Sequence, residues 1–223
     1  MGKSERIFVF IPGAWHGAWA FDLIVEKMEK RKCIPLTLPG LEIQDKIPKK
    51  IINLDTHIQY VVDVLVKDDI TNIILCGHSY AGMVITGVAD KIPERIYALV
   101  YIDAYIPKDG DSCWNLTSEE YRHRFAAGSA VDGFTVADRP DVDSRRRPHP
   151  LATFMQSLRL NGNYRQVRNR TFIYMTGWED TPFTKQYETL KDSPGWDIVT
   201  VPWGHDIMQE NPDRLVEILN EIQ

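Results

Sequence analysis

Short apolar runs of strand length alternate with segments of helical periodicity along most of the chain. The apolar runs lie at residues 6–12, 33–38, 72–76, 97–102, 171–176 and 197–201, and the helical segments at 17–30, 55–67, 81–91, 184–191 and 212–222. A nearly continuous apolar run is typical of a strand that is buried on both faces. Because strands that alternate with helices form parallel sheets, we predict an α/β fold with a mostly parallel sheet flanked by helices.

One long segment interrupts this alternation. Residues 105–166 contain no strand pattern, and 138–150 are rich in Arg, Asp and Pro. We interpret 105–166 as a small cap of short helices and loops, inserted within a single domain that spans 1–223. A chain of 223 residues suits one domain with a sizeable core. The arginines at 145–147 are interpreted as part of a solvated loop rather than an anion site.

Charge and cysteine content argue against several kinds of partner. The formal net charge of -5 gives no electrostatic reason to expect nucleic acid or an anionic membrane. The first apolar run ends at Pro12, which is too short for a signal peptide or a membrane helix, so we expect a cytoplasmic protein. Cys33, Cys76 and Cys113 are scattered without C-x-x-C spacing, which argues against a disulfide framework or a metal site.

A serine lies at a predicted strand-to-helix turn. Residues 77–82 read GHSYAG, with Ser79 between an apolar run and a helical segment. Gly77 and Ala81, two places before and after the serine, are small enough to let strand and helix approach closely. Such a turn exposes the hydroxyl at a helix N-terminus, where backbone N–H groups favour negative charge. We predict that Ser79 is a nucleophile, although Ala81 replaces the second glycine of the full G-x-S-x-G pattern.

A histidine lies on the loop between the last predicted strand and the last predicted helix. This loop reads VPWGHD at residues 201–206 and contains His205. The strand-to-helix turn at residues 77–82 is called the elbow below. In chains with a serine at such an elbow, the base follows the nucleophile and the acid in sequence. Imidazole has an ordinary pKa of about 6.5, so it can accept and return a proton near neutral pH. We predict that His205 is the base.

Five other histidines compete for this role. His78 lies inside the elbow and His16 in the first loop, where either could line a substrate pocket. His57 lies at a helix start, and His123 and His149 lie in the cap, so we interpret these three as surface residues.

Two aspartates end strands from which a carboxylate could reach His205. Asp103 ends the fourth apolar run, and Asp180 follows the fifth. A carboxylate bound to imidazole fixes its tautomer and orientation. An unpaired carboxylate at the end of a buried strand is costly, which favours a partner for Asp103. We predict Asp103 as the acid and keep Asp180 as the alternative, with Glu179 as a weaker one.

The loop after the first apolar run is a candidate oxyanion site. It reads PGAWHGAW at residues 12–19. Backbone N–H groups in such a loop stabilise the oxyanion of an acyl-transfer intermediate. We assign Ala14 as one donor and Tyr80, which follows the serine, as the other. Trp15 is a candidate wall of the substrate pocket. Aromatic side chains of the cap could contribute to the same pocket, namely Trp114, Phe125, Phe134 and Phe154.

A resemblance to a known family rests on six segments: PGAWHGAWAF, LTLPGL, INLDTHI, CGHSYAGMVITGVADKIPERI, LVYIDAYIPKDGDS and WGHDIMQENPDRL. Together they resemble the bacterial branch of the plant methylesterase and hydroxynitrile lyase family of α/β hydrolases, over nearly the whole chain apart from the cap. The resemblance implies the α/β-hydrolase fold and a cofactor-free serine hydrolase that acts on small, often aromatic or apolar esters. Pyrethroid-type and carbamate-type esterases are among the relatives that it implies.

Details of the resemblance favour an esterase with Asp103 as the acid. Bacterial relatives often lack an aspartate at the position of Asp180 but keep the one that matches Asp103. Lyases of this family have threonine at the position of Gly13 and lysine at that of Asp206. We therefore predict hydrolysis of a small-molecule ester through an acyl-enzyme. A hydroxynitrile-lyase-type carbon–carbon lyase and a non-catalytic protein that binds a small ligand remain alternatives, and the oligomeric state stays open.

Overall fold

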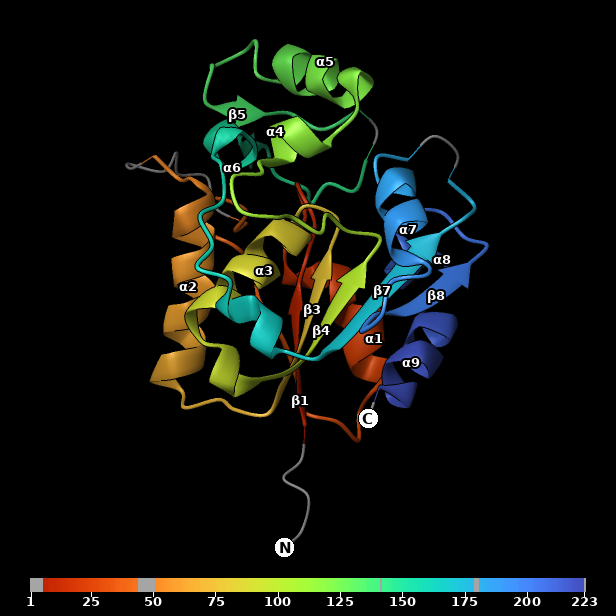
Figure 1. Ribbon diagram of the computed structural model, residues 1–223. Coiled ribbons are helices and arrows are strands. Elements are labelled where there is room, and N and C mark those ends of the chain that lie inside the picture. The colour runs from red at the N-terminus through yellow and green to blue at the C-terminus, as the bar shows by residue number, and fades with distance from the viewer. Residues whose placement is uncertain (1–5, 44–50, 141, 179–180, 223) are drawn as a thin grey trace, which may run out of the picture.

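The centre of the molecule is a six-stranded sheet in which every neighbouring pair of strands is parallel. The computed structural model describes residues 6–43, 51–140, 142–178 and 181–222 (Figure 1). The strand order is β2-β1-β3-β4-β7-β8. The strands are β1 (Ile7–Ile11), β2 (Cys33–Pro35), β3 (Ile73–His78), β4 (Ile96–Ile102), β7 (Asn169–Met175) and β8 (Asp197–Val201). The predicted parallel sheet is therefore present.

Helices cover both faces of this sheet. One face is covered by α2 (Leu54–Lys67), α3 (Ala81–Lys91) and α7 (Thr184–Leu190). The other face is covered by the 3-10 turn η1 (Ala18–Phe21), α1 (Asp22–Lys27), α8 (Ile207–Glu210) and α9 (Pro212–Glu221). The helix predicted at 17–30 is shorter than expected, because its first turn adopts the tighter 3-10 form before α1 begins. A second 3-10 turn, η2 (Pro93–Arg95), connects α3 to β4.

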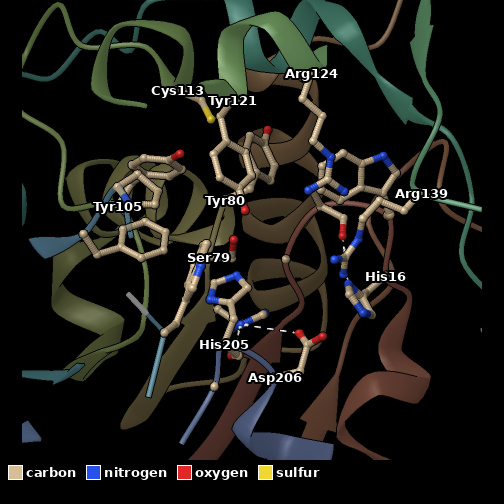
Figure 2. A pocket seen from close by; sticks show the side chains of 18 of the residues that line it. His16, Ser79, Tyr80, Tyr105, Cys113, Tyr121, Arg124, Arg139, His205 and Asp206 are labelled. Atoms are coloured by element: carbon tan, nitrogen blue, oxygen red, sulfur yellow. Dashed lines mark hydrogen bonds and ion pairs between the residues drawn. The ribbon is translucent and has the colours of Figure 1, made fainter. Parts of the chain in front are cut away.

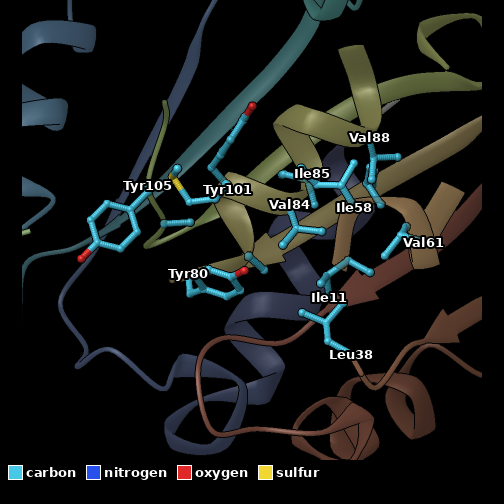
Figure 3. Close-up of a cluster of buried hydrophobic side chains, with 14 of the residues drawn as sticks. Ile11, Leu38, Ile58, Val61, Tyr80, Val84, Ile85, Val88, Tyr101 and Tyr105 are labelled. Carbon is cyan, nitrogen blue, oxygen red and sulfur yellow. The ribbon is translucent and has the colours of Figure 1, made fainter. Parts of the chain in front are cut away.

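Successive strand residues point to opposite faces and so divide the core into two clusters. In β1, Ile11 belongs to the cluster beneath α2 and α3, whereas Phe10 belongs to the one beneath α1 and α9. Ile58 of α2 and Val84 of α3 pack into the first cluster (Figure 3). Complete burial of one such side chain contributes about 1.5–3 kcal/mol. Burial on both faces explains why the strands appear in the sequence as continuous apolar runs.

The segment between β4 and β7 covers the carboxyl ends of the strands (Figure 1). It contains α4 (Cys113–Leu116), α5 (Glu119–Gly128), β5 (Thr135–Val136), β6 (His149–Pro150), α6 (Leu151–Met155) and the 3-10 turn η3 (Asn163–Gln166). β5 and β6 form a small antiparallel pair that the sequence did not predict, since two residues are too few to show a period. After α6 the chain returns along α3, against which η3 packs. No helix in the described part of the chain has the length and apolar character that a membrane crossing requires.

Candidate active site

Ser79 lies at a tight turn between β3 and α3. Its φ is +55°, in the left-handed region that side chains other than glycine rarely adopt. Backbone hydrogen bonds connect this turn to the end of β4 and to the loop that follows β4. Ser79 N donates to Ile102 O of β4 at 3.1 Å, and Tyr105 N donates to Ser79 O at 3.1 Å. The strained turn leaves the hydroxyl at the edge of the sheet, where it faces a pocket beneath the cap (Figure 2).

Two glycines near Ser79 permit close backbone approach. A Cβ on Gly77 would lie 2.9 Å from the carbonyl oxygen of Ala81, and a Cβ on Gly82 would overlap the backbone of Tyr105. The turn therefore requires glycine at 77 and 82, while alanine is accommodated at 81. This arrangement explains how the chain forms the elbow without the second glycine of the full pattern.

His205 and Asp103 meet at the carboxyl edge of the sheet. Asp103 directly follows β4, and His205 lies on the loop between β8 and α8. His205 Nδ1 donates a hydrogen bond to Asp103 Oδ2 at 2.7 Å. Because a carboxylate only accepts, the proton is on Nδ1, and Nε2 is left free to take a proton. The structure thus brings together two of the predicted site residues.

The Asp103 carboxyl is 0% exposed, so its neighbours decide its charge. Its other oxygen, Oδ1, accepts from Met175 N at 3.3 Å. Burial raises the pKa of Asp103 above its ordinary value, and the hydrogen bond from His205 offsets part of that effect. The alternatives Asp180 and Glu179 lie outside the described residues.

His78 supports the loop that carries His205. Its Nε2 donates to the backbone carbonyl of His205 at 2.9 Å, and its ring lies 4.4 Å from the His205 ring. Burial lowers the pKa of His78 well below the ordinary value, so the ring is neutral. His78 lines the cavity, and it also fixes the backbone next to the predicted base.

The two predicted oxyanion donors line the same cavity as Ser79. The loop after β1, which contains Ala14, packs closely against the turn at Ser79, since a Cβ on Gly13 would lie 2.9 Å from Ser79 Cβ. Within the described residues, neither Ala14 N nor Tyr80 N donates a hydrogen bond to the protein. Two unoccupied N–H groups beside a serine are what a developing oxyanion requires.

The cavity above Ser79 has a volume of about 310 Å³. Its apolar wall comes from the cap and from the loops after β1, β4 and β7, and it consists of Trp15, Tyr105, Cys113, Tyr121, Phe125, Phe154, Trp178 and Phe183. Trp15, Phe125 and Phe154 had been predicted to line it. Trp114 and Phe134 do not, and Phe134 is 74% exposed. The aromatic residues of the loops after β4 and β7 were not predicted, because nothing in a single sequence shows which loops meet.

An ion-pair chain joins the cap to the loop of His205. Asp138 pairs with Arg124 at 2.6 Å and with Arg146 at 2.7 Å, and Arg146 pairs with Asp206 at 3.1 Å. The side chain of Arg146 is only 12% exposed, so the predicted solvated loop is wrong at this position. Burial alone would raise the pKa of Asp206, but the neighbouring histidines and Arg146 hold it at about 2.

The surface locations predicted for His57 and His149 are wrong, because both side chains are fully buried. His57 Nε2 donates to Pro39 O at 3.0 Å, and its Nδ1 accepts from the Tyr80 hydroxyl at 3.0 Å. An imidazole with both nitrogens bonded can be buried in its neutral form. Burial accordingly lowers the pKa of His57 to about 4. His123 is exposed, as predicted.

Comparison with known proteins gives consistent results. A sequence model described as the alpha/beta hydrolase family matches residues 8–218. The carbendazim hydrolyzing esterase of Nocardioides sp. (strain SG-4G) is 34% identical over 235 residues, which cover 95% of this chain and 97% of that protein.

Two solved structures share the fold. The extracellular alpha/beta-hydrolase from a Paenibacillus species superposes with a TM-score of 0.81 at 19% identity and covers 98% of this chain and 99% of that one. The pyrethroid hydrolase from Sphingobium faniae JZ-2 superposes with a TM-score of 0.74 at 18% identity and covers 98% of this chain and 97% of its own.

Proposed function

Because the chain belongs to the alpha/beta hydrolase family, we propose that it is an esterase that cleaves small esters or carbamates through an acyl-enzyme on Ser79. The observation that carries this proposal is the 2.7 Å hydrogen bond between buried Asp103 and His205, which lines the same cavity as the strained Ser79. That constellation suits acyl transfer by a serine nucleophile. The esterase among the relatives supports the same class of enzyme.

In the proposed reaction, Ser79 Oγ attacks the substrate carbonyl carbon while His205 Nε2 takes the hydroxyl proton. Asp103 stabilises the imidazolium that forms. The N–H groups of Ala14 and Tyr80 donate to the oxyanion of the tetrahedral intermediate. His205 then gives its proton to the leaving oxygen or nitrogen. A water molecule, deprotonated by His205, finally releases the acyl or carbamoyl group from Ser79.

The cavity limits the class of substrate. A volume of about 310 Å³ is at the lower end of the range for small-molecule sites. The aromatic wall favours a flat apolar or aromatic group, which can stack on rings such as Phe125 and Trp178. Carbendazim, named in the relative's description, supports an aryl carbamate as one candidate. The proposed steps use only side chains, backbone N–H groups and water, and so need no cofactor.

The expected location and partners of the protein rest on its sequence alone. A cytoplasmic location and the lack of nucleic-acid or membrane partners stay predictions. No observation on the described residues favours the carbon–carbon lyase or the binding-protein alternative.

The proposed function is tested by hydrolysis of p-nitrophenyl butyrate and of a methyl N-aryl carbamate. We expect Ser79→Ala to lower kcat by about 10⁴-fold or more, because the nucleophile is lost. Ser144→Ala is the matched control, since Ser144 lies on an exposed loop and should keep the wild-type rate. Wild-type turnover in the Ser79→Ala variant would contradict the proposal.

A further inference from the structure

A buried histidine of the cap is bonded to the loop that contains Ala14. His149 Nδ1 lies 3.3 Å from Trp15 N, and His149 Nε2 lies 2.8 Å from Thr153 Oγ1. Thr153 uses its own proton to donate to Pro150 O at 2.8 Å, so it accepts from His149. The proton of His149 is therefore on Nε2, and Nδ1 is the acceptor for the Trp15 N–H. Burial lowers the pKa of His149 well below the ordinary value, which keeps this neutral tautomer.

The Ala14–Trp15 peptide group is held at both ends. Its carbonyl oxygen, on Ala14, accepts from His16 Nδ1 at 2.8 Å, and its N–H donates to His149. Trp15 has φ +66°, a conformation that persists in a non-glycine residue only when its surroundings impose it. The Cα of Ala14 joins this peptide to the preceding one, which carries the Ala14 N–H, so a shift of the held peptide that moves this Cα would displace the proposed oxyanion donor.

The cap supplies most of the bonds that hold Trp15. Besides the bond to His149, Trp15 Nε1 donates to Val136 O at 2.8 Å, and Trp15 O accepts from Arg147 N at 3.0 Å. These three partners lie in the segment between β4 and β7. Their bonds explain how a strained loop next to Ser79 is kept in one conformation.

His149 also contacts the second proposed donor. Its ring packs edge-to-face on the ring of Tyr80, with centroids 4.7 Å apart, and stacks on Phe154 at 4.4 Å. The hydroxyl of Tyr80 donates to His57 Nδ1, which is bonded in turn to Pro39 O. One buried imidazole thus bonds to the peptide that follows Ala14 and packs on the ring of Tyr80.

We propose that His149 is a positioning residue for the oxyanion hole, and that its neutral imidazole holds the Ala14–Trp15 peptide so that the Ala14 N–H faces the substrate oxygen. The proposal rests on the proposed esterase function. It makes the cap a part of the site that stabilises the transition state, in addition to its role as a wall of the substrate pocket.

Two substitutions separate the hydrogen bond from the packing. His149→Phe keeps a ring that can stack on Phe154 but removes the acceptor for Trp15 N–H. His149→Asn loses the ring but can place its Oδ1 where Nδ1 lies, and so restores the acceptor. If His149 acted only through stability, the asparagine variant should have a lower kcat than the phenylalanine variant, because it loses the aromatic contacts. The proposal predicts the opposite order for kcat.

The expected result is a fall in kcat of about 10- to 100-fold for His149→Phe, below the 10²–10³-fold loss when an oxyanion donor is removed outright. KM should stay within about twofold, because the bond acts on the transition state. His149→Asn should recover most of the lost kcat. Inhibition by an aryl trifluoromethyl ketone, which forms a tetrahedral adduct, should weaken in the phenylalanine variant by the same factor as kcat.

A second measurement does not depend on activity. The Trp15 amide should exchange its proton slowly in the wild type and in His149→Asn, and faster in His149→Phe. A phenylalanine variant with unchanged kcat and unchanged Trp15 exchange would overturn the inference. The same assay includes the wild type and Ser79→Ala. If turnover does not depend on Ser79, the proposed function fails; if it does and the His149 variants behave like the wild type, only this inference fails.

Discussion

Ser79, Asp103 and His205 come from three separate loops, and each is fixed by a different contact. Backbone bonds to the end of β4 and to the loop that follows it hold Ser79 at its positive φ. Asp103 also has a positive φ, of 41°, and its buried carboxyl is bonded to His205 and to Met175 N. His78 holds the backbone of His205. Strain of this kind occurs at functional sites, where the surrounding structure imposes it.

The first prediction concerns the acid. Asp103→Asn should lower kcat/KM by about 10³–10⁴-fold, because asparagine favours the wrong tautomer of His205. Asp180→Asn is the comparison, and it should stay near the wild-type rate. Steady-state hydrolysis of p-nitrophenyl butyrate measures both. A large loss in the Asp180 variant together with a near-normal Asp103 variant would exclude our assignment of the acid.

At the scale of elements, the sequence predicted the strands and helices that periodicity can reveal. The six strands of the sheet and the helices α2, α3, α7 and α9 lie within a few residues of their predicted ranges. The two-residue strands β5 and β6 and the four-residue helix α8 are too short to produce a period. The burial of His57 and His149 was missed for another reason. Their partners Tyr80 and Trp15 lie 23 and 134 residues away, and one sequence carries no signal for such pairs.

The second prediction concerns the junction of β3 and α3. Gly82→Ala should lower the free energy of unfolding by several kcal/mol or prevent folding, because its Cβ would overlap the backbone of Tyr105. Ala81→Gly is the control and should cost only about 1 kcal/mol, the difference in helix propensity. Denaturant unfolding compares the two variants. If Gly82→Ala had the wild-type free energy of unfolding, the close approach of residue 82 to Tyr105 would not be required.

At the scale of the whole molecule, the predicted α/β-hydrolase fold is confirmed by the family match and by the parallel sheet. The connection between cap and sheet could not be predicted. Arg146 and Asp206 are 60 residues apart, and the arginines at 145–147 appear in the sequence as an ordinary charged loop. The ion-pair chain from Arg124 to Asp206 attaches the cap to the loop of His205.

The third prediction tests this attachment. Arg146→Met keeps the apolar stem but leaves Asp206 without its cation, so the free energy of unfolding should fall by on the order of 2 kcal/mol. The pKa of Asp206 should rise from about 2. Arg145→Met is the matched control and should change stability little, because Arg145 is exposed and its ion pairs with Asp143 and Asp22 lie at the surface. Equal losses in the two variants would contradict a specific role for Arg146.

The fourth prediction concerns stability at acidic pH. Burial lowers the pKa values of His57, His78 and His149, and that of His57 to about 4. Below about pH 6.5 the unfolded chain binds protons at these histidines and the folded chain does not. Stability should therefore fall as the pH decreases from 6.5 toward 4, by up to about 1.4 kcal/mol per pH unit for each histidine.

The contribution of one histidine can be isolated by substitution. Between pH 7 and pH 5, His57→Gln should lose about 2 kcal/mol less stability than the wild type, whatever its stability at pH 7. Denaturant unfolding at the two pH values measures the difference. An identical fall in both proteins would show that His57 is not buried in its neutral form.

The central claim is that Ser79 is the nucleophile of an esterase, and covalent labelling tests it most directly. Wild-type protein treated with diethyl p-nitrophenyl phosphate should gain one diethylphosphoryl group on the peptide that contains Ser79. Its turnover of p-nitrophenyl butyrate should fall in proportion to the labelled fraction, and Ser79→Ala should gain no label. A label on another residue, or full turnover after stoichiometric labelling of Ser79, would contradict the account.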